Sequence, residues 1–194
     1  MPSLEYDRTF LQAGIPELEK YLLSDEIYWP LGLRALQGEA PFPRMTLGWL
    51  LLARERARGW QASGIPPAQS HVIEQLAIRM DAIRTRWRAA WENKARQEFR
   101  SRLTLWTNFI NEYRKDRGGH ANRYPYEVQR RAMLHLLQQE AREIPDPELE
   151  LLHRMDRFLQ SVLAPGEFVW EAEIAPAFPR DVYWYLYGSL PAGA

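Results

Sequence analysis

The sequence contains no cysteine, and its 194 residues carry equal numbers of acidic and basic side chains. The lack of cysteine excludes disulfides, thiolate metal sites and cysteine nucleophiles, and it fits a reducing cytoplasm. A net charge of zero gives no overall preference for nucleic acid, a membrane surface or an acidic substrate. The longest apolar run, residues 47–53, is far shorter than the ~20 residues of a membrane span, and the N-terminus lacks a signal-peptide pattern. We therefore expect a cytoplasmic protein with no membrane contact.

Glycine and proline are absent from residues 70–117, although the chain contains 11 Gly and 14 Pro. Both residue types interrupt helices, so their absence predicts one long helix. At 1.5 Å per residue this helix would be roughly 70 Å long, whereas a compact domain of this size has a diameter of about 42 Å. The helix would overhang its own domain unless it bends, breaks or packs against a second copy. We favour packing against a second copy, with a bend as the alternative.

The apolar positions of this stretch change their spacing part-way along it. From Ile73 to Trp87 they alternate in steps of three and four, which is typical of coiled-coil-like packing. From Trp87 to Leu103 every step is four, and each such step rotates the apolar stripe by about 40°. The two halves of the stretch therefore face nearly opposite directions and must contact different neighbours.

The segments on either side predict shorter elements. Residues 1–15 show no clear period and predict a loosely packed arm, and Gly118-Gly119 predicts the end of the long helix. The short turn before Pro147 predicts that the helices on its two sides run antiparallel. The helices predicted outside the long one cover residues 16–23, 44–58, 125–143 and 147–163.

The C-terminal segment alternates apolar and acidic residues from Phe168 to Ile174, which predicts a half-buried strand. Residues 182–187 have similar chemistry and would pair with it, and a short aromatic helix that starts at Pro179 is the alternative. The eight tryptophans of the chain predict an aromatic-rich core or interface.

The fold class predicted from these patterns is mainly α: a bundle of about five helices around one very long central helix (about 70–117), with a small C-terminal aromatic β-hairpin or short helix. We expect a single domain over residues 1–194. Its parts are short helices and loops (1–69), the long helix (70–117), an antiparallel helix pair (125–163) and an aromatic C-terminal segment (164–194).

Charge is unevenly distributed along the chain. Residues 84–102 contain seven basic and two acidic side chains, whereas residues 138–194 contain ten acidic and four basic ones. A basic helix with tryptophans predicts a nucleic-acid interface, in which cations track the phosphates and aromatic rings stack on bases. The other interpretation is that the acidic ends of the chain fold back and neutralise this helix. The residues of the predicted interface are Arg84, Arg88, Trp91, Lys94, Arg96, Arg100 and Arg102.

The end of the long helix and the loop after it concentrate polar groups next to an aromatic stripe. Arginines here would clamp a carboxylate or a phosphate, so the region around residues 108–126 predicts a small anionic ligand. A helix end whose carbonyls are satisfied by nearby side chains is the structural alternative. The candidate ligand residues are Asn111, Arg114, His120, Asn122, Arg123, Tyr124 and Tyr126.

No motif for a phosphate loop, a nucleophile elbow or a zinc helix occurs in the sequence. The pair Glu150 and His153 has the spacing of a helical metal ligand set, but a lone pair of this kind does not make a site. We therefore predict no metal and no cofactor. The leading hypothesis is a non-catalytic interaction or assembly protein that forms a homo-oligomer. The missing motifs argue against an enzyme and leave that question open. Nucleic-acid binding and anion binding are the alternatives.

Overall fold

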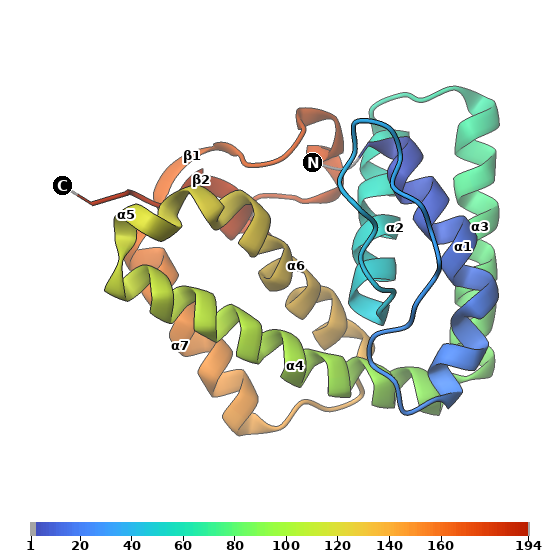
Figure 1. The fold of residues 1–194 in the computed structure, drawn as a ribbon, viewed down its shortest axis with the longest axis horizontal. Coiled ribbons are helices and arrows are strands. Elements are labelled where there is room, and N and C mark those ends of the chain that lie inside the picture. The colour runs from blue at the N-terminus through green and yellow to red at the C-terminus, as the bar shows by residue number, and fades with distance from the viewer. Residues whose placement is uncertain (1–2, 194) are drawn as a thin grey trace.

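The computed structural model describes residues 3–193 and is mainly α, as the sequence predicts (Figure 1). None of the helices in this range combines the length and the apolar character that a membrane span needs. The α-helices are α1 (Leu4–Leu23), α2 (Leu47–Ala62), α3 (Pro67–Arg86), α4 (Arg88–Lys115), α5 (Arg117–His120), α6 (Tyr124–Glu140) and α7 (Asp146–Val162). The strands are β1 (Ala164–Phe168) and β2 (Tyr187–Ser189), and the 3₁₀ helices are η1 (Ala121–Arg123), η2 (Ala172–Ala177) and η3 (Trp184–Leu186).

The prediction of one continuous long helix is wrong, because the stretch breaks at Trp87 into α3 and α4. Trp87 has φ −112° and ψ 33°, outside the helical region, although the backbone hydrogen bonds on both sides of it are kept. Figure 1 shows α4 leaving the lower end of α3 at a steep angle. The break coincides with the change of apolar spacing, so each half turns its stripe onto the core. The bend was the less favoured alternative, and it removes the overhang.

Residues 4–15 form the first half of α1 rather than a loose arm. Ser3 caps the helix by accepting a hydrogen bond from the Tyr6 amide, and acidic residues occupy the first turn. Pro16 lies inside the helix and is not its start. The apolar period was hidden because Asp7, a charged residue, is fully buried on the same face.

The C-terminal hairpin is present, but its strands lie elsewhere than predicted. β1 pairs antiparallel with β2, with Ala164 opposite Ser189 and Phe168 opposite Tyr187. The last three residues of the predicted strand, 172–174, belong instead to the 3₁₀ helix η2 (Ala172–Ala177). Gly59 of α2 explains this. Because glycine has no side chain, the backbone of Ile174 lies in the space that a Cβ atom on residue 59 would occupy.

Gly118-Gly119 does not end the long helix as a loop. The helix α4 ends at Lys115, and Asp116 then caps the short helix α5 by accepting a hydrogen bond from the Gly119 amide at 2.9 Å. Both glycines are therefore helical. Asp116 therefore serves both helices: its extended backbone ends α4, and its carboxylate caps the N-terminus of α5.

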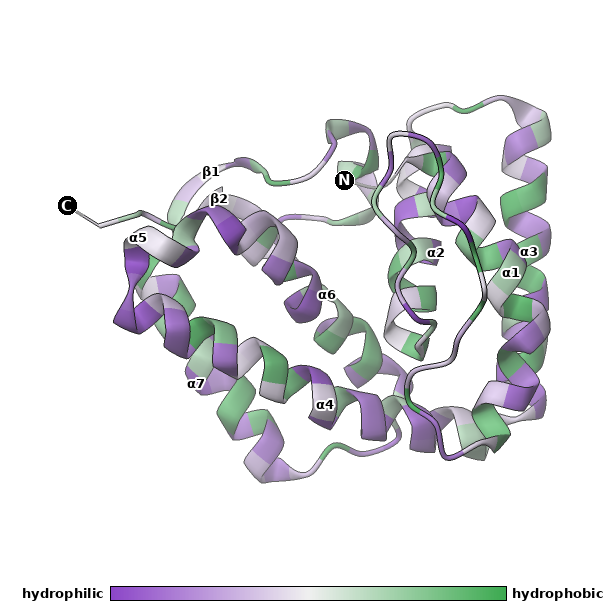
Figure 2. Ribbon diagram, viewed as in Figure 1, coloured by the Kyte–Doolittle hydropathy of each residue, from purple (hydrophilic) through white to green (hydrophobic). Residues whose placement is uncertain are grey.

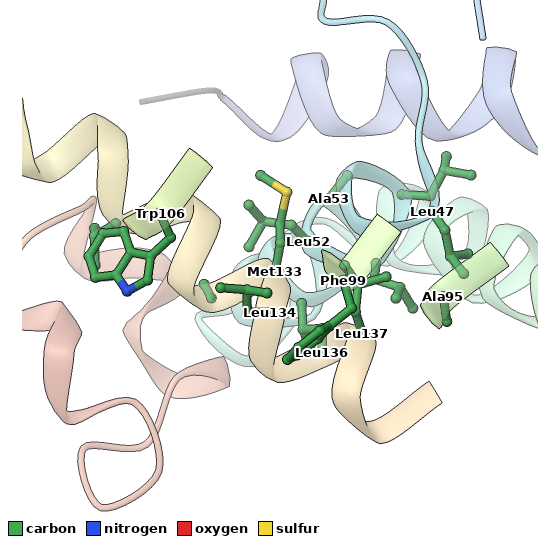
Figure 3. Close-up of a cluster of buried hydrophobic side chains, with 14 of the residues drawn as sticks. Leu47, Leu52, Ala53, Ala95, Phe99, Trp106, Met133, Leu134, Leu136 and Leu137 are labelled. Atoms are coloured by element: carbon green, nitrogen blue, oxygen red, sulfur yellow. The ribbon is translucent and has the colours of Figure 1, made fainter. Parts of the chain in front are cut away.

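One hydrophobic core joins α2, α4 and α6 (Figure 3). Leu52, Phe99 and Leu137 come from these three helices and are fully buried. The helices α6 and α7 both contact α4, whereas α1 and α3 pack beside α2. Figure 2 shows hydrophobic and hydrophilic residues interleaved along these helices, as expected of amphipathic helices around a shared core.

Candidate functional site

The predicted anion site at residues 108–126 is occupied by an ion-pair network. The Arg123 guanidinium donates to Glu127 at 2.7 Å and to Glu112 at 3.3 Å, and it lies 3.0 Å from Nδ1 of His120. Glu127 is almost fully buried and also pairs with Arg130. Two carboxylates already neutralise Arg123, so an anionic ligand would have to displace one of them.

The other candidates of this region do not converge on one point. Arg114 lies over the ring of Phe158, with its guanidinium carbon 4.9 Å from the ring centroid. Tyr124 is buried, and its hydroxyl donates to the Tyr185 carbonyl. Asn111 and Asn122 are exposed, and no described residue bonds their side chains. Tyr126 is also exposed, but it lines a groove described below.

The predicted basic face is partly buried. Lys94 is 2% exposed and donates to the carbonyls of Ser24 and Glu26, and burial lowers its pKa. Arg102 donates to the buried carboxylate of Glu98 at 3.0 Å. Trp91 is buried as well, and its indole donates to Glu140. These side chains support the core and have no surface to offer a phosphate.

Three exposed arginines of this face are paired with carboxylates, as the second interpretation of the charge pattern expects, whereas the exposed Arg96 donates to the side-chain oxygen of Asn93 at 3.0 Å. Arg84 pairs with Glu140, and Arg100 pairs with Glu148 from the acidic C-terminal half. Arg88 pairs within α4 with Glu92. The hollow beside the break at Trp87 is lined by three arginines and three carboxylates, so it carries no excess of positive charge: Arg84, Arg88, Arg142, Asp81, Glu92 and Glu140.

A different hollow, which we call the aromatic groove, has a volume of about 840 Å³ and joins segments that are far apart in the sequence. Its residues come from α1, the loop before α2, α2 itself, the first turns of α6 and the segment after β1. It is lined by Tyr6, Gly38, Glu39, Ala40, Pro41, Pro43, Trp49, Pro125, Tyr126, Gln129, Val169, Trp170 and Glu171.

One wall of the groove belongs to a closed loop. The backbones of Trp29 and Met45 exchange two hydrogen bonds of 2.8 Å, so residues 30–44 leave and return at the same place. Compact loops of this length with ends close together are frequently functional. In Figure 1 the loop crosses in front of α2.

The loop is fastened to α1 by Tyr6. The Tyr6 ring stacks on Phe42 with a centroid distance of 4.2 Å, and its hydroxyl donates to the Pro41 carbonyl at 3.2 Å. Burial raises the pKa of Tyr6 to about 12, an effect that the nearby Arg56 opposes. The phenol therefore stays protonated at neutral pH and keeps donating to the loop.

The opposite wall is fastened by Trp170, which is 6% exposed. Its indole N–H donates to the Pro125 carbonyl at 2.9 Å and so ties the C-terminal segment to the start of α6. Trp49 lies in the first turn of α2, with the Arg102 guanidinium 5.6 Å from its ring centroid. Packing on three sides therefore holds the aromatic side chains of the groove in place.

Gln129 is a mostly buried polar side chain at this groove. It is 4% exposed and lines the groove, and no hydrogen bond joins its amide to another residue in the range 3–193. Its amide atoms are not fully buried, so they reach the solvent of the groove, where a ligand would replace water as their partner.

A buried ion pair supports the floor of the groove next to Tyr6. Asp7 accepts from Nε of Arg56 at 3.0 Å and from its Nη2 at 2.5 Å, and both side chains are at most 1% exposed. Burial raises the pKa of Asp7 to about 6 against the opposing charge of Arg56. The pair locks α1 to α2 and leaves Arg56 with no charge to offer a ligand.

The sequence pointed to only one groove residue, Tyr126. The loop at 38–43 was recognised as rich in Gly and Pro, but its contact with Tyr6 joins positions that are 35 residues apart. The 23 residues without a helix between α1 and α2 do indicate a functional region, because long loops in compact domains are often functional. Trp170 was assigned to a strand, which concealed its bond to α6.

Among residues 3–193, no group of three or more His, Asp and Glu side chains is placed to hold a metal ion. Comparison of the chain with protein-family models, with characterised proteins and with solved structures found no match. The functional argument therefore rests on the geometry of the groove.

Proposed function

We propose that this protein is a non-catalytic interaction protein that binds a partner in the aromatic groove. The observation that carries the proposal is the groove itself, a hollow of about 840 Å³ whose aromatic wall residues Tyr6 and Trp170 are fixed by hydrogen bonds to Pro41 and Pro125. Rigid aromatic side chains beside a few placed polar groups are typical of binding sites. The lining contains no Ser, Thr, His or Lys, and the phenol of Tyr6 is committed to the loop.

The test is a titration of the protein with a mixed library of peptides and small molecules, followed by NMR of the indole N–H groups. Trp49 and Trp170 line the groove, whereas Trp87 lies at the break between α3 and α4 and serves as an internal control. We expect binders to shift the Trp49 and Trp170 signals and to leave Trp87 unchanged. The proposal is overturned if no library member shifts the indole N–H signal of Trp49 or of Trp170.

Two variants sharpen this test. Tyr126→Ala removes an aromatic ring that is 62% exposed, so the fold should tolerate it, and we expect it to weaken every binder. Tyr28→Ala removes another exposed tyrosine, which does not line the groove, and should bind like wild type. Equal loss in both variants would mean that the binders attach to exposed aromatic side chains in general.

Homo-oligomer formation stays a prediction. The overhang of a long helix, which motivated it, disappears with the break at Trp87. The accessible surface of 10158 Å² is close to the roughly 9,600 Å² expected of a compact monomer of this mass. Light scattering over a range of concentrations decides the question, and a constant monomer mass would remove the prediction.

Nucleic-acid binding through the exposed arginines of residues 84–102 also stays a prediction, as does a cytoplasmic location. Binding would require single-stranded RNA or DNA to displace the carboxylates that pair with Arg84, Arg88 and Arg100. It would weaken steeply with salt. Absence of binding at low ionic strength would remove this alternative.

A further inference from the structure

A group of cationic side chains, which we call the basic end, lies where α4, α5 and α7 meet. Arginines elsewhere in the described chain are mostly paired with carboxylates, as Arg54, Arg84 and Arg100 are. The members of the basic end are exposed, and no carboxylate in the range 3–193 forms an ion pair with them: Arg114, Lys115, Arg117, Arg154 and Arg157. The basic end is therefore a local excess of charge on a chain whose net charge is zero.

The packing of α7 on α4 brings these side chains together. Arg100 pairs with Glu148 near the start of α7. Arg114 lies over the ring of Phe158 near the end of α7, so the two helices run side by side in the same direction. Arg154 precedes Phe158 by one helical turn and shares its face of α7, which places Arg154 beside the Arg114 contact. Figure 1 shows this end of α4 next to α5, on the opposite side of the molecule from α3.

The carboxylates near the basic end are mostly committed to other partners. Glu112 belongs to the ion-pair network at Arg123, and Asp116 caps α5. Asp156 of α7 accepts two hydrogen bonds from the Arg131 guanidinium. Glu150 is exposed and forms no bond within the described chain, so it opposes the cations by one charge. The basic end keeps an excess of positive charge.

Helix dipoles explain only part of this pattern. Cations are favourable in the last turn of a helix, and Arg114 and Lys115 occupy the last turn of α4. Arg154 and Arg157 precede the last turn of α7, which holds no basic residue. The stability of α7 therefore gives no reason for these two arginines, and their charge is available to a partner.

The surface around the basic end is polar. Thr104, Asn108 and Asn111 continue the exposed face of α4, and hydroxyl and amide groups of this kind bind phosphate and sugar oxygens. The large hydrophobic side chains that are exposed in the described chain belong to elements other than α4, α5 and α7. Membrane surfaces and amphipathic helices bind through such hydrophobic side chains. The surface therefore favours a hydrophilic polyanion.

The basic end also offers no open aromatic ring. Phe158 carries the Arg114 guanidinium on its ring and packs against Tyr113, with a centroid distance of 6.5 Å. Sites for single-stranded nucleic acid typically combine cations with aromatic rings on which bases stack. A duplex keeps its bases stacked internally and presents only phosphates and sugars to such a surface.

We propose that the basic end binds the phosphodiester backbone of a nucleic-acid duplex without reading its bases. Guanidinium groups donate paired hydrogen bonds to phosphate oxygens, and the hydroxyl and amide groups of α4 contact the same backbone. This surface is separate from the aromatic groove and from the face at residues 84–102 that the sequence predicts. The proposal therefore does not depend on the proposed function.

The experiment is fluorescence anisotropy of a short labelled DNA duplex of mixed sequence, titrated with the full-length protein at salt concentrations from about 50 to 200 mM. Each neutralised phosphate releases about one counterion, so we expect the logarithm of the binding constant to fall against the logarithm of salt with a slope of roughly −4. Duplexes of different sequence should bind equally. Absence of binding at the lowest salt concentration would overturn the proposal.

Two double variants assign the binding to a surface. Arg154→Gln with Arg157→Gln removes two exposed cations without an ion pair, so the fold should tolerate it. We expect weaker binding by about tenfold or more and a slope reduced by about two. Arg34→Gln with Arg79→Gln is the matched control, since it removes the same charge from exposed, unpaired arginines of the loop before α2 and of α3. An equal loss in both variants would mean that net charge alone attracts the duplex, and would overturn the proposal.

Competing partners and surfaces give different results in the same assay. A duplex RNA should bind like the duplex DNA, whereas a single strand that binds more tightly than either duplex would contradict the proposal. Poly-glutamate that displaces the duplex at equal charge concentration would identify an acidic protein segment as the partner instead. Loss of binding in Arg88→Gln with Arg96→Gln, with the Arg154 and Arg157 variant unaffected, would place binding at residues 84–102 and overturn the proposal.

Discussion

Two buried carboxylates of this protein, Asp7 and Glu98, tie one helix to another. Asp7 of α1 holds Arg56 of α2, and the buried carboxylate of Glu98 accepts from Arg102 and from the Gly48 amide at the start of α2. Removing one member of such a pair strands the other and typically costs about 3–5 kcal/mol. These residues therefore act on function indirectly, by fixing the helices that form the groove.

His135 gives the fold a specific dependence on pH. Burial and the neighbouring Arg131 lower its pKa, although Asp156 opposes them, and its ring lies against the edge of Tyr183. Because the unfolded chain then binds the proton more readily, stability is fully present above the ordinary histidine pKa of about 6.5 and is lost as pH falls through the lower folded value.

We predict that, as pH falls below 6.5, the free energy of unfolding of His135→Gln rises relative to that of wild type, because only wild type carries the His135 effect. The raised pKa of Asp7 acts in the opposite direction over part of this range, but it is common to both proteins and cancels in the comparison. Denaturant titrations between pH 5 and 8 measure it. His153→Gln is the control, because His153 is exposed and should leave the wild-type pH dependence intact. Identical pH profiles for wild type and His135→Gln would contradict the assignment.

At the scale of elements, close approaches of backbones decide where the C-terminal segment lies. A Cβ atom on Gly59 would stand 2.6 Å from the Ile174 Cα and 2.5 Å from its carbonyl oxygen, both backbone atoms of η2. These atoms cannot rotate away as a side chain would. The fit of η2 against α2 therefore depends on this glycine.

Gly59→Ala should destabilise the protein by about 1–3 kcal/mol, despite the better helix propensity of alanine, because η2 must move. Chemical denaturation measures the change. Gly118→Ala is the matched control, since the nearest atom to its added Cβ would be 3.6 Å away, and it should be nearly neutral. A Gly59→Ala protein as stable as wild type would mean that η2 does not pack on α2.

The sequence predicted the elements whose apolar period is regular, and missed those set by distant contacts. The helices α2, α6 and α7 follow their predicted ranges to within a few residues, because their buried faces repeat at helical spacing. The first half of α1 was missed because a buried Asp7 interrupts the stripe. The groove was missed because five separate segments create it, and no local pattern reports their meeting.

At the scale of the whole molecule, the break at Trp87 lets the two halves of the chain share one core. In Figure 1, α1 and α3 both lie on one side of α2. Helix α4 starts at the lower end of α3 and runs to the other side, where it meets α6 and α7. The aromatic groove takes residues from both sides, namely Tyr6 and Trp49 from the first and Tyr126 from the second. A bound segment would therefore contact both halves.

The absence of cysteine makes the break measurable with spin labels, because introduced cysteines are the sole attachment points. Labels at Glu74 and Asn111, both exposed, would be roughly 56 Å apart along a straight helix. We predict a pulsed-EPR distance clearly shorter than this. Labels at Ala89 and Asn111, within α4, should give the roughly 33 Å of a straight helix and serve as the control. A straight-helix distance for the first pair would contradict the break.

The central claim is that partners bind in the aromatic groove, and hydrogen–deuterium exchange of the wild-type protein with and without a binder from the library tests it most directly. We predict slower exchange in residues 38–40, 126–129 and 169–171, three segments that the sequence separates and the groove unites. Protection confined to the exposed face of α4 around residues 88–96, with the groove segments unchanged, would contradict the claim.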